Sequence, residues 1–521
     1  MAAPFRLALA GGLIFLFALI FGFYGFRKFL NYKIAQNVAL KKGGEMRKAW
    51  TKIPLAVEFR IYIFNVTNSE EVHRGAKPVV NEIGPYFYDE WKEKVRLVDN
   101  AKEDTVSFNQ RTTWYFNKEA SGGLTGNETV VIPHAALLGL VLNVEREKPG
   151  ALTMINKAIG PMFGNPDSIF LRATAKDILF EGIVINCTST EFAPKAICTL
   201  LRQNPKGLTK VNEHIFKFSF FGSKNGTIDD GRLEVKRGVK DAKEVGKVVS
   251  FNGKSELDVW SGAECNALRG TDSTIFPPFL TPQDDIVSFA PDLCRSLGAK
   301  YQYPIVYQGI PGNHYTATLG DMSNNAEEKC FCPSENKCLK KGAFDITKCA
   351  GAPIILTLPH FFETDPSYLD TVDGLRPNKE EHQIYLNFEP ITGTPLGARK
   401  RLQFNIEIHS VIKIPIMRNL PVSLIPLFWV EEGLELNKTF IDLLEANLFR
   451  TMRIVDTGRW VLMVVGVGLV AAGAGLNYHR RSTRTMVPKI STRTLVVGSE
   501  EHTTGYSATS PATATVAPQK Y

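Results

Sequence analysis

Residues 7–26 read LALAGGLIFLFALIFGFYGF, a stretch without a charged side chain. At about 1.5 Å per helical residue, a helix of this length crosses the roughly 30 Å hydrocarbon core of a bilayer. A second uncharged stretch, WVLMVVGVGLVAAGAGLNY, fills residues 460–478 near the other end of the chain. The two stretches exclude an ordinary soluble protein and predict two transmembrane helices that flank a large middle segment.

The first stretch lies close enough to the start of the chain to suggest a cleavable signal peptide, which needs a short apolar region followed by an A-x-A-like site. Here the apolar run is longer and ends in FYGFRK at residues 23–28. We therefore expect an uncleaved anchor, preceded by a short tail of residues 1–6 and followed by an ectodomain of residues 27–459. Residues 479–521 are rich in Ser, Thr, Ala and Pro, which predicts a disordered C-terminal tail.

Basic residues orient only one of the two spans. Arg480, Arg481 and Arg484 place the C-terminal tail in the cytosol, whereas Arg6 competes with the basic residues that follow the first span. The middle segment resolves the ambiguity, because it holds every N-x-[ST] sequon without proline: Asn65, Asn127, Asn186, Asn225 and Asn437. It also holds all eight cysteines: Cys187, Cys198, Cys265, Cys294, Cys330, Cys332, Cys338 and Cys349. Single sequons arise by chance, but together with an even number of cysteines they favour a glycosylated, oxidising exterior, with both tails in the cytosol.

The spans contain small-xxx-small spacings, which permit close helix approach. They are Ala18/Gly22 in the first span, and Gly468/Ala472 and Ala471/Gly475 in the second. Small residues are also frequent in membrane helices in general, which is the alternative to packing of the two spans or a homo-oligomer.

Period-two patterning dominates the ectodomain. In LQFNIEIH, residues 402–409, apolar and polar side chains alternate, which predicts a half-buried strand. Residues 384–388 precede it across a turn-rich connection and predict an antiparallel partner. Residues 59–66, 106–116 and 215–221 are further strand candidates, several of them apolar on both faces. That pattern fits a sandwich core or the wall of a barrel.

Helical periodicity is confined to four stretches of the ectodomain, residues 152–163, 168–180, 194–203 and 439–453. The first three form a block between β regions. The last leads into the second span.

Charge and motif content exclude several functional classes. The net charge of +8 is not concentrated in a basic patch, so nucleic acid is a poor partner. The sequence contains no H-E-x-x-H, G-x-S-x-G, GxxxxGK[ST] or strand-to-helix GxGxxG motif. His134 and His360 each follow a proline and are expected to be structural hydrogen-bonding groups. A hydrolase using Ser273 or another serine is disfavoured, and we expect no enzyme activity, no cofactor and no metal.

The cluster Cys330-x-Cys332, Cys338 and Cys349 has four thiols that could in principle bind zinc. Its C-x-C start departs from the usual zinc knuckle, and the expected compartment is oxidising, so disulfides are favoured. The six cysteines from Cys265 to Cys349 allow about 15 pairings, and composition does not choose among them.

Several segments, taken in order, resemble the class B scavenger receptors, the fatty-acid translocase family, over both spans and the whole ectodomain. They are residues 63–68 (IFNVTN), 75–78 (GAKP) with 82–86 (EIGPY), 291–295 (PDLCR), 330–332 (CFC) and 426–433 (PLFWVEEG). Within that family the chain is similar to the insect sensory neuron membrane proteins, and to their type-one subgroup more than to type two. The segments that carry this closer resemblance are residues 88–94 (YDEWKEK), 113–117 (TWYFN), 124–126 (LTG) and 177–180 (DILF).

The resemblance implies an α+β membrane protein, with an antiparallel β-barrel ectodomain, a helical cap at about 152–203 and an internal hydrophobic tunnel. The family's cysteine order implies the pairs Cys265–Cys330, Cys294–Cys349 and Cys332–Cys338, which leaves Cys187 with Cys198. Neither tail has the cysteines that accept palmitate in mammalian members, nor an acidic dileucine signal, so the plasma membrane is favoured over lysosomes. The basic cap residues of the family cannot be matched one by one to this sequence.

The resemblance also implies a function in olfactory neurons. There the protein would capture a long-chain, lipid-like odorant or pheromone and pass it through the tunnel to the membrane or to an adjacent odorant receptor, with odorant-binding proteins as further candidate partners. The alternative is a scavenger-type receptor for lipoproteins, fatty acids or carotenoids in support or gut cells. The ligand-binding residues are not identifiable from the sequence.

Overall fold

The computed structural model describes residues 3–203, 207–334 and 337–485, and it divides into two compact units. Among these described residues, one unit comprises 3–24 with 455–485, and the other lies within 25–454. The expected disordered tail lies outside the described residues from position 486 onward.

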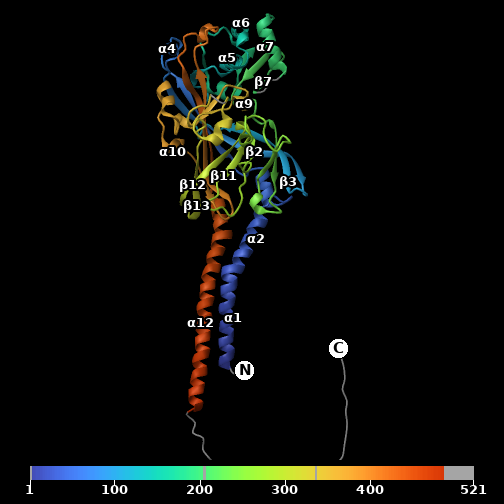
Figure 1. Cartoon of the computed structure of the whole chain (residues 1–521), viewed down its shortest axis with the longest axis vertical. Coiled ribbons are helices and arrows are strands. Elements are labelled where there is room, and N and C mark those ends of the chain that lie inside the picture. Colours follow the sequence, from blue (N-terminus) through green and yellow to red (C-terminus); the bar gives the residue numbers. More distant parts are fainter. Residues whose placement is uncertain (1–2, 204–206, 335–336, 486–521) are drawn as a thin grey trace, which may run out of the picture. The chain divides into compact units, whose positions relative to one another are not determined.

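The first unit is a pair of packed apolar helices (Figure 1). They are α1 (Ala3–Ile20), continued by the π-helix η1 (Phe21–Gly25), and the long α12 (Arg450–Thr485). Glycines allow the backbones to touch: a methyl group added at Gly11 would lie 2.6 Å from the carbonyl oxygen of Gly466. Arg459 packs across Gly22, with its guanidinium 4.2 Å from the centre of the Phe23 ring.

Only some of the small residues expected to pack do so. Ala18 and Gly22 are buried, whereas a methyl group at Gly468 or Gly475 would meet open space. The α12 contacts instead come from Gly466 and Gly473, because these two residues lie on the face of α12 that is turned toward α1.

The second unit is built on one large antiparallel sheet, in the order β10-β9-β3-β2-β1-β18-β17-β16-β13-β12-β11. The strands are β1 (Val57–Val66), β2 (Val80–Asn100), β3 (Thr105–Phe116), β9 (Ile228–Lys236), β10 (Val248–Phe251), β11 (Ile286–Ala290), β12 (Arg295–Tyr307), β13 (Ile310–Ala317), β16 (Ile384–Glu389), β17 (Thr394–Ile408) and β18 (Ser423–Glu435). Two short strands extend this sheet: β15 (Ile355–Thr357) pairs with β17, and β14 (Phe344–Asp345) pairs with β15. Thr271 forms bridges to Lys247 next to β10 and to Ser288 in β11, so the sheet curls into a nearly closed barrel.

Strands predicted from period-two patterning are confirmed where the pattern is long. Residues 59–66, 106–116 and 384–388 lie in β1, β3 and β16, and residues 402–408 lie in β17. The β16–β17 pair is antiparallel, as predicted. The candidate at 215–221 is shorter than expected, because β8 (Ile215–Phe218) ends before Phe220 and Phe221, which turn toward the barrel strands.

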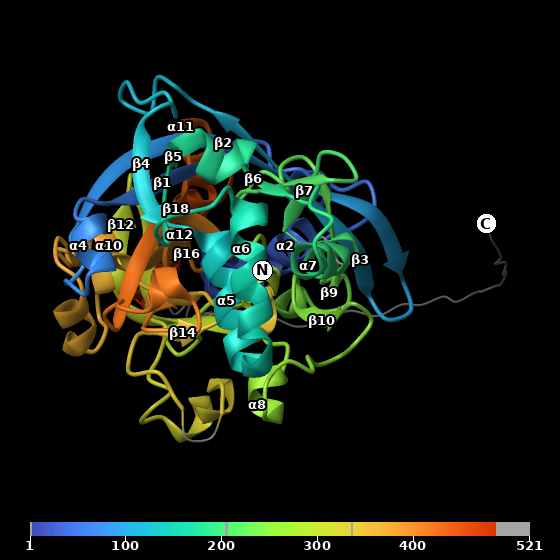
Figure 2. The ribbon, with the colours of Figure 1, turned by 90° about the horizontal axis from the view of Figure 1, so that it is seen from above.

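A block of helices and two small sheets covers one end of the barrel (Figure 2). It contains α5 (Ala135–Glu147), the 3₁₀ turn η2 (Pro149–Ala151), α6 (Leu152–Phe163), the π-helix η3 (Asp177–Glu181), α7 (Phe192–Gln203), the pair β4 (Thr129–Pro133) and β5 (Phe170–Thr174), and the sheet β6 (Ile183–Asn186), β8 and β7 (Leu208–Lys210). We call this block the cap.

The predicted helix over 152–163 is α6, but the predicted helix over 168–180 is wrong. That stretch holds strand β5, which pairs with β4 through Phe170 and Pro133, before η3 begins. Its apolar residues suit either element, and pairing with a strand distant in the sequence decides between them. The sequence also missed α5, so the helical block begins at Ala135.

Shorter helices connect these parts. They are α2 (Phe26–Val38), α3 (Glu45–Thr51), α4 (Ser69–His73), α8 (Ala263–Asn266), α9 (Thr347–Ala350), α10 (Lys379–His382), α11 (Lys438–Leu444), the π-helix η10 (Glu445–Phe449) and the 3₁₀ turns η4 (Ala242–Glu244), η5 (Pro291–Leu293), η6 (Ala326–Phe331), η7 (Pro359–Phe361), η8 (Pro366–Thr371) and η9 (Pro415–Met417). Helix α3 buries Trp50 in the barrel, where its Nε1 donates to Asp272 Oδ2 at 2.8 Å and Lys94 Nζ lies 4.6 Å from its ring centre.

Four disulfides tie the unit together: Cys187–Cys198, Cys265–Cys330, Cys294–Cys349 and Cys332–Cys338. The last three are the pairs that the resemblance implies, and Cys187–Cys198 is the pair that was left over. They engage all four thiols of the alternative zinc cluster, so that cluster has no thiolates left to bind a metal.

Candidate functional site

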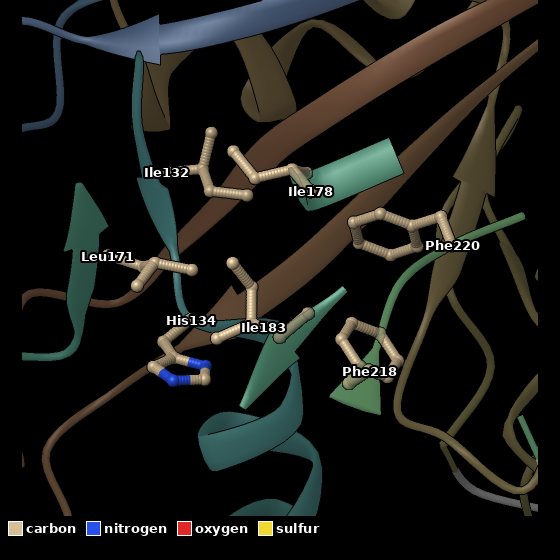
Figure 3. A pocket seen from close by; sticks show the side chains of 8 residues that line it. Ile132, His134, Leu171, Ile178, Ile183, Phe218 and Phe220 are labelled. Atoms are coloured by element: carbon tan, nitrogen blue, oxygen red, sulfur yellow. The ribbon is translucent and has the colours of Figure 1, made fainter. Parts of the chain in front are cut away.

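A small apolar cavity lies within the cap (Figure 3). The residues that line it come from β4, α5, β5, η3, β6, β8 and the segment that follows β8: Ile132, His134, Ala135, Leu171, Ile178, Ile183, Phe218 and Phe220. Its volume of about 10 Å³ is close to the room that one water molecule occupies. A larger ligand therefore enters only if these side chains move apart.

His134 is the single ionisable side chain in this lining. Burial lowers its pKa to about 4, so the imidazole is neutral near pH 7. Its Nδ1 accepts from the Leu137 N–H at 3.5 Å, which caps the start of α5, and its ring meets Phe163 edge to face. His134 thus has the structural role predicted for it.

His360 is also held by structural hydrogen bonds. Its Nδ1 accepts from the Arg376 N–H at 3.0 Å, and its Nε2 lies 2.7 Å from Glu82 Oε2. Trp429 Nε1 donates to the same Glu82 oxygen at 2.6 Å. The two imidazoles singled out in the sequence therefore help to fix the cap and the outer face of the barrel.

Next to the cavity, aromatic rings from the barrel wall and the cap pack against one another. We call this set the aromatic cluster; its members are Phe59, Tyr88, Trp114, Phe180, Phe220, Phe221, Phe404 and Phe428. Phe220 lines the cap cavity and lies 4.5 Å from Phe428, centre to centre. Phe221 lies 5.4 Å from Phe59. The apolar lining of the cap thus continues without a break into the barrel.

Charged side chains follow the aromatic cluster along β2, β17 and β18, and two more come from the turn before β9 and from η5. Lys92 Nζ lies 2.6 Å from Glu432 and 3.3 Å from Glu90, and Lys224 Nζ lies 2.7 Å from Asp292. Lys400 is opposite Glu432 in the β17–β18 register. We call these six residues the polar belt.

The belt residues influence one another's ionisation. Burial raises the pKa of Glu90 to about 7, because the nearby Lys92 offsets the desolvation of the carboxylate only in part. Burial opposes ionisation of Glu432 as well, but Lys92 and Lys400 outweigh it and lower the pKa to about 2. In Asp292 the effect of burial is likewise overcome, by Lys224 first and then by Lys400 and Lys92, so its pKa is lowered.

A second, open groove of about 980 Å³ lies over the disulfide region. Charged and polar side chains make up much of its lining, among them Arg295, whose Nη2 lies 2.7 Å from Glu328 Oε1. Because it is polar and open, it does not resemble a site for an alkyl chain.

The sequons differ in accessibility. Asn127, Asn225 and Asn437 are exposed, whereas Asn65 and Asn186 are half-buried, and Asn437 accepts through Oδ1 to cap α11. Asn225 is more constrained, because its amide group bonds both the N–H and the carbonyl of Trp114. Asn65 accepts from the Val131 N–H through Oδ1, and Asn186 accepts from Thr188.

Two packed apolar helices, long enough to cross a bilayer, and a capped, disulfide-bonded β-barrel with an aromatic interior make this an α+β membrane protein. The chain belongs to the CD36 family, whose model matches residues 9–476. It is 46% identical over 478 residues to sensory neuron membrane protein 1 of Apis mellifera, with 92% of each chain covered. It is 47% identical over 476 residues to the protein of that name from Mamestra brassicae, and 45% identical over 481 residues to that from Manduca sexta, with at least 90% of each chain covered.

Proposed function

We propose that the protein captures a long-chain, lipid-like odorant such as a pheromone and passes it through the ectodomain to the bilayer or to an adjacent odorant receptor. The observation that supports this most directly is the continuity of apolar side chains from the cap cavity through Phe220 to the aromatic cluster. About twelve methylenes cost on the order of 10 kcal/mol to expose to water, at ~0.8 kcal/mol each. An apolar path removes that barrier, and no bond has to be made or broken.

The proposal includes a topology. Residues 27–459 would lie outside the plasma membrane of a sensory neuron, with residues 1–6 and 479–521 in the cytosol. The sequons and the four disulfides support an exterior location, since both modifications belong to the secretory route. The odorant receptor complex and soluble odorant-binding proteins are the proposed partners.

Two neighbouring residues of β6 allow a matched test. Ile183 lines the cap cavity, whereas Val184 points away from it and its side chain is 49% exposed. Ile183→Trp adds far more volume than a cavity of about 10 Å³ can hold, and Val184→Trp adds the same ring to the surface.

Both variants would be expressed in cells together with a receptor for a lipid-like odorant. Ile183→Trp should slow the response and lower its sensitivity at unchanged surface delivery, while Val184→Trp should behave as wild type. Equal responses from both variants would contradict a path through the cap. Uptake of lipoprotein particles without any odorant response would favour the scavenger alternative.

A further inference from the structure

The apolar path does not continue through the whole barrel, because the polar belt lies directly beyond the aromatic cluster. Strand register shows the order. On β18 and β17, Phe428 faces Phe404, and further along the same strands Glu432 faces Lys400. The aromatic layer is therefore nearer the cap and the charged layer is nearer α11, which follows β18.

Strand β2 repeats this order. Tyr88 belongs to the aromatic cluster and stacks on Phe180 at 4.4 Å, and the next side chains on the same face are Glu90 and Lys92. Phe59 on β1 pairs with both Tyr88 and Glu432, which places the two layers in contact. The interior is thus amphipathic along the barrel axis.

The belt spans the barrel rather than one patch of its wall. Lys92 and Lys400 come from β2 and β17, whereas Asp292 belongs to η5 after β11, at the far end of the sheet. Both lysines nevertheless lie close enough to Asp292 to lower its pKa. The Asp292 and Lys224 side chains have 72% and 59% of their surface accessible, although desolvation is the largest single influence on each pKa. Both side chains therefore keep accessible surface beside their ion pair.

Lys400 differs from the other two lysines of the belt. Lys92 and Lys224 each form an ion pair, whereas no hydrogen bond or ion pair engages the exposed Lys400 ammonium within residues 3–203, 207–334 and 337–485. Glu90 Oε2 is buried 3.3 Å from Lys92 without a well-aligned hydrogen bond. The belt therefore holds a free donor next to an incompletely satisfied charge cluster.

We propose that the polar belt binds the oxygen-bearing head group of an amphiphilic ligand, with Lys400 donating to its carboxylate or carbonyl oxygen while the aromatic cluster holds the alkyl chain. This assignment rests on the proposed function and adds a specificity residue to it. A chain without an oxygen would find no partner in the belt and would leave those charges desolvated. The barrel would thus favour oxygenated lipids over plain hydrocarbons.

Three probes with one fluorophore test the proposal on the full-length chain in nanodiscs: 11-(dansylamino)undecanoic acid, its methyl ester, and N-undecyl dansylamide, which ends in a methyl group. Energy transfer from tryptophan to dansyl reports binding. Lys400→Met should weaken binding of the acid about tenfold to a hundredfold, as expected for loss of a charged hydrogen bond, weaken the ester less, and leave the alkyl probe unchanged. Lys400→Arg should retain most of the affinity for the acid.

Lys224 supplies a second variant with a matched control. Lys224→Met and Lys254→Met both break an ion pair whose lysine side chain is 59% exposed, but Lys254 pairs with Asp258 outside the belt. Only Lys224→Met should alter the preference for the acid over the alkyl probe.

The outcomes distinguish failure of the belt assignment from failure of the proposed function. Equal loss for all three probes in Lys400→Met, or no loss for any, would overturn the belt assignment. If the wild-type protein binds the alkyl probe but neither the acid nor the ester, the belt assignment is overturned and the proposed function stays intact. Absence of binding of every probe by the wild type would overturn both.

Discussion

Removing the Cys294–Cys349 disulfide should cost more stability than removing Cys332–Cys338. The first bridge closes a loop with a sequence separation of 55 residues and the second one of 6. On the chain-entropy relation, these loops correspond to about 4 and about 2 kcal/mol of stabilisation. The difference of about 2 kcal/mol is a factor of about thirty in the folding equilibrium.

The longer bridge also bears on the interior of the barrel. Cys294 directly follows η5, which carries Asp292 of the polar belt, and Cys349 lies on α9. Without the bridge, η5 is held by the buried Leu293 side chain and by the Asp292–Lys224 ion pair, so Asp292 should be less firmly positioned next to Lys224. A ligand-binding defect is expected in whatever fraction of the variant still folds.

The assay is the fraction of protein that reaches the cell surface, compared among Cys294→Ser, Cys349→Ser and the double variant. All three should be retained inside the cell to a similar degree, because the second substitution removes a thiol that has already lost its partner. The double variant Cys332→Ser/Cys338→Ser should be delivered better. Additive losses from the two single substitutions would show that Cys294 and Cys349 are not partners, and equal retention of the two double variants would refute the loop-length reasoning.

Three further predictions concern other parts of the molecule. Burial lowers the pKa of His134 in the folded state to about 4, so the unfolded chain binds the proton first as pH falls and stability should decrease from about pH 6.5 to pH 4. The variant His134→Asn keeps a helix-capping side chain and should flatten the Tm profile over this pH range. An unchanged slope in the variant would show that other groups cause the pH dependence. Gly466→Leu should separate α1 from α12 and lower surface delivery, whereas Gly468→Leu, at a position facing open space, should not; identical delivery would argue against the helix pair. A secreted ectodomain of residues 31–455 should bind a long-chain probe yet fail to restore fast neuronal responses, because it lacks the membrane tether that raises its local concentration to roughly millimolar. Full rescue by the secreted form would point to a soluble carrier.

Local sequence was sufficient for the elements whose signal is local. The spans at 7–26 and 460–478 follow from uncharged length alone, and both fall in helices long and apolar enough to cross a bilayer. Alternation over 402–409 identified β17, and the short connection from 384–388 identified its antiparallel partner. Family resemblance, rather than spacing, was needed to choose one cysteine pairing among the alternatives.

Tertiary structure alone decided the elements and sites that depend on distant partners. The stretch 168–180 has apolar residues that suit a helix or a strand, and pairing of β5 with β4 settles the choice. Strands that are apolar on both faces are consistent with a barrel wall around an interior cavity. They do not predict which aromatic residues lie in contact there. Lys92 and Glu432 are 340 residues apart, and nothing in either segment marks the other as its partner. The polar belt exists only because curling of the sheet turns one face of β2, β17 and β18 inward and brings η5 across the barrel, where charges from distant segments lie close enough to shift one another's pKa.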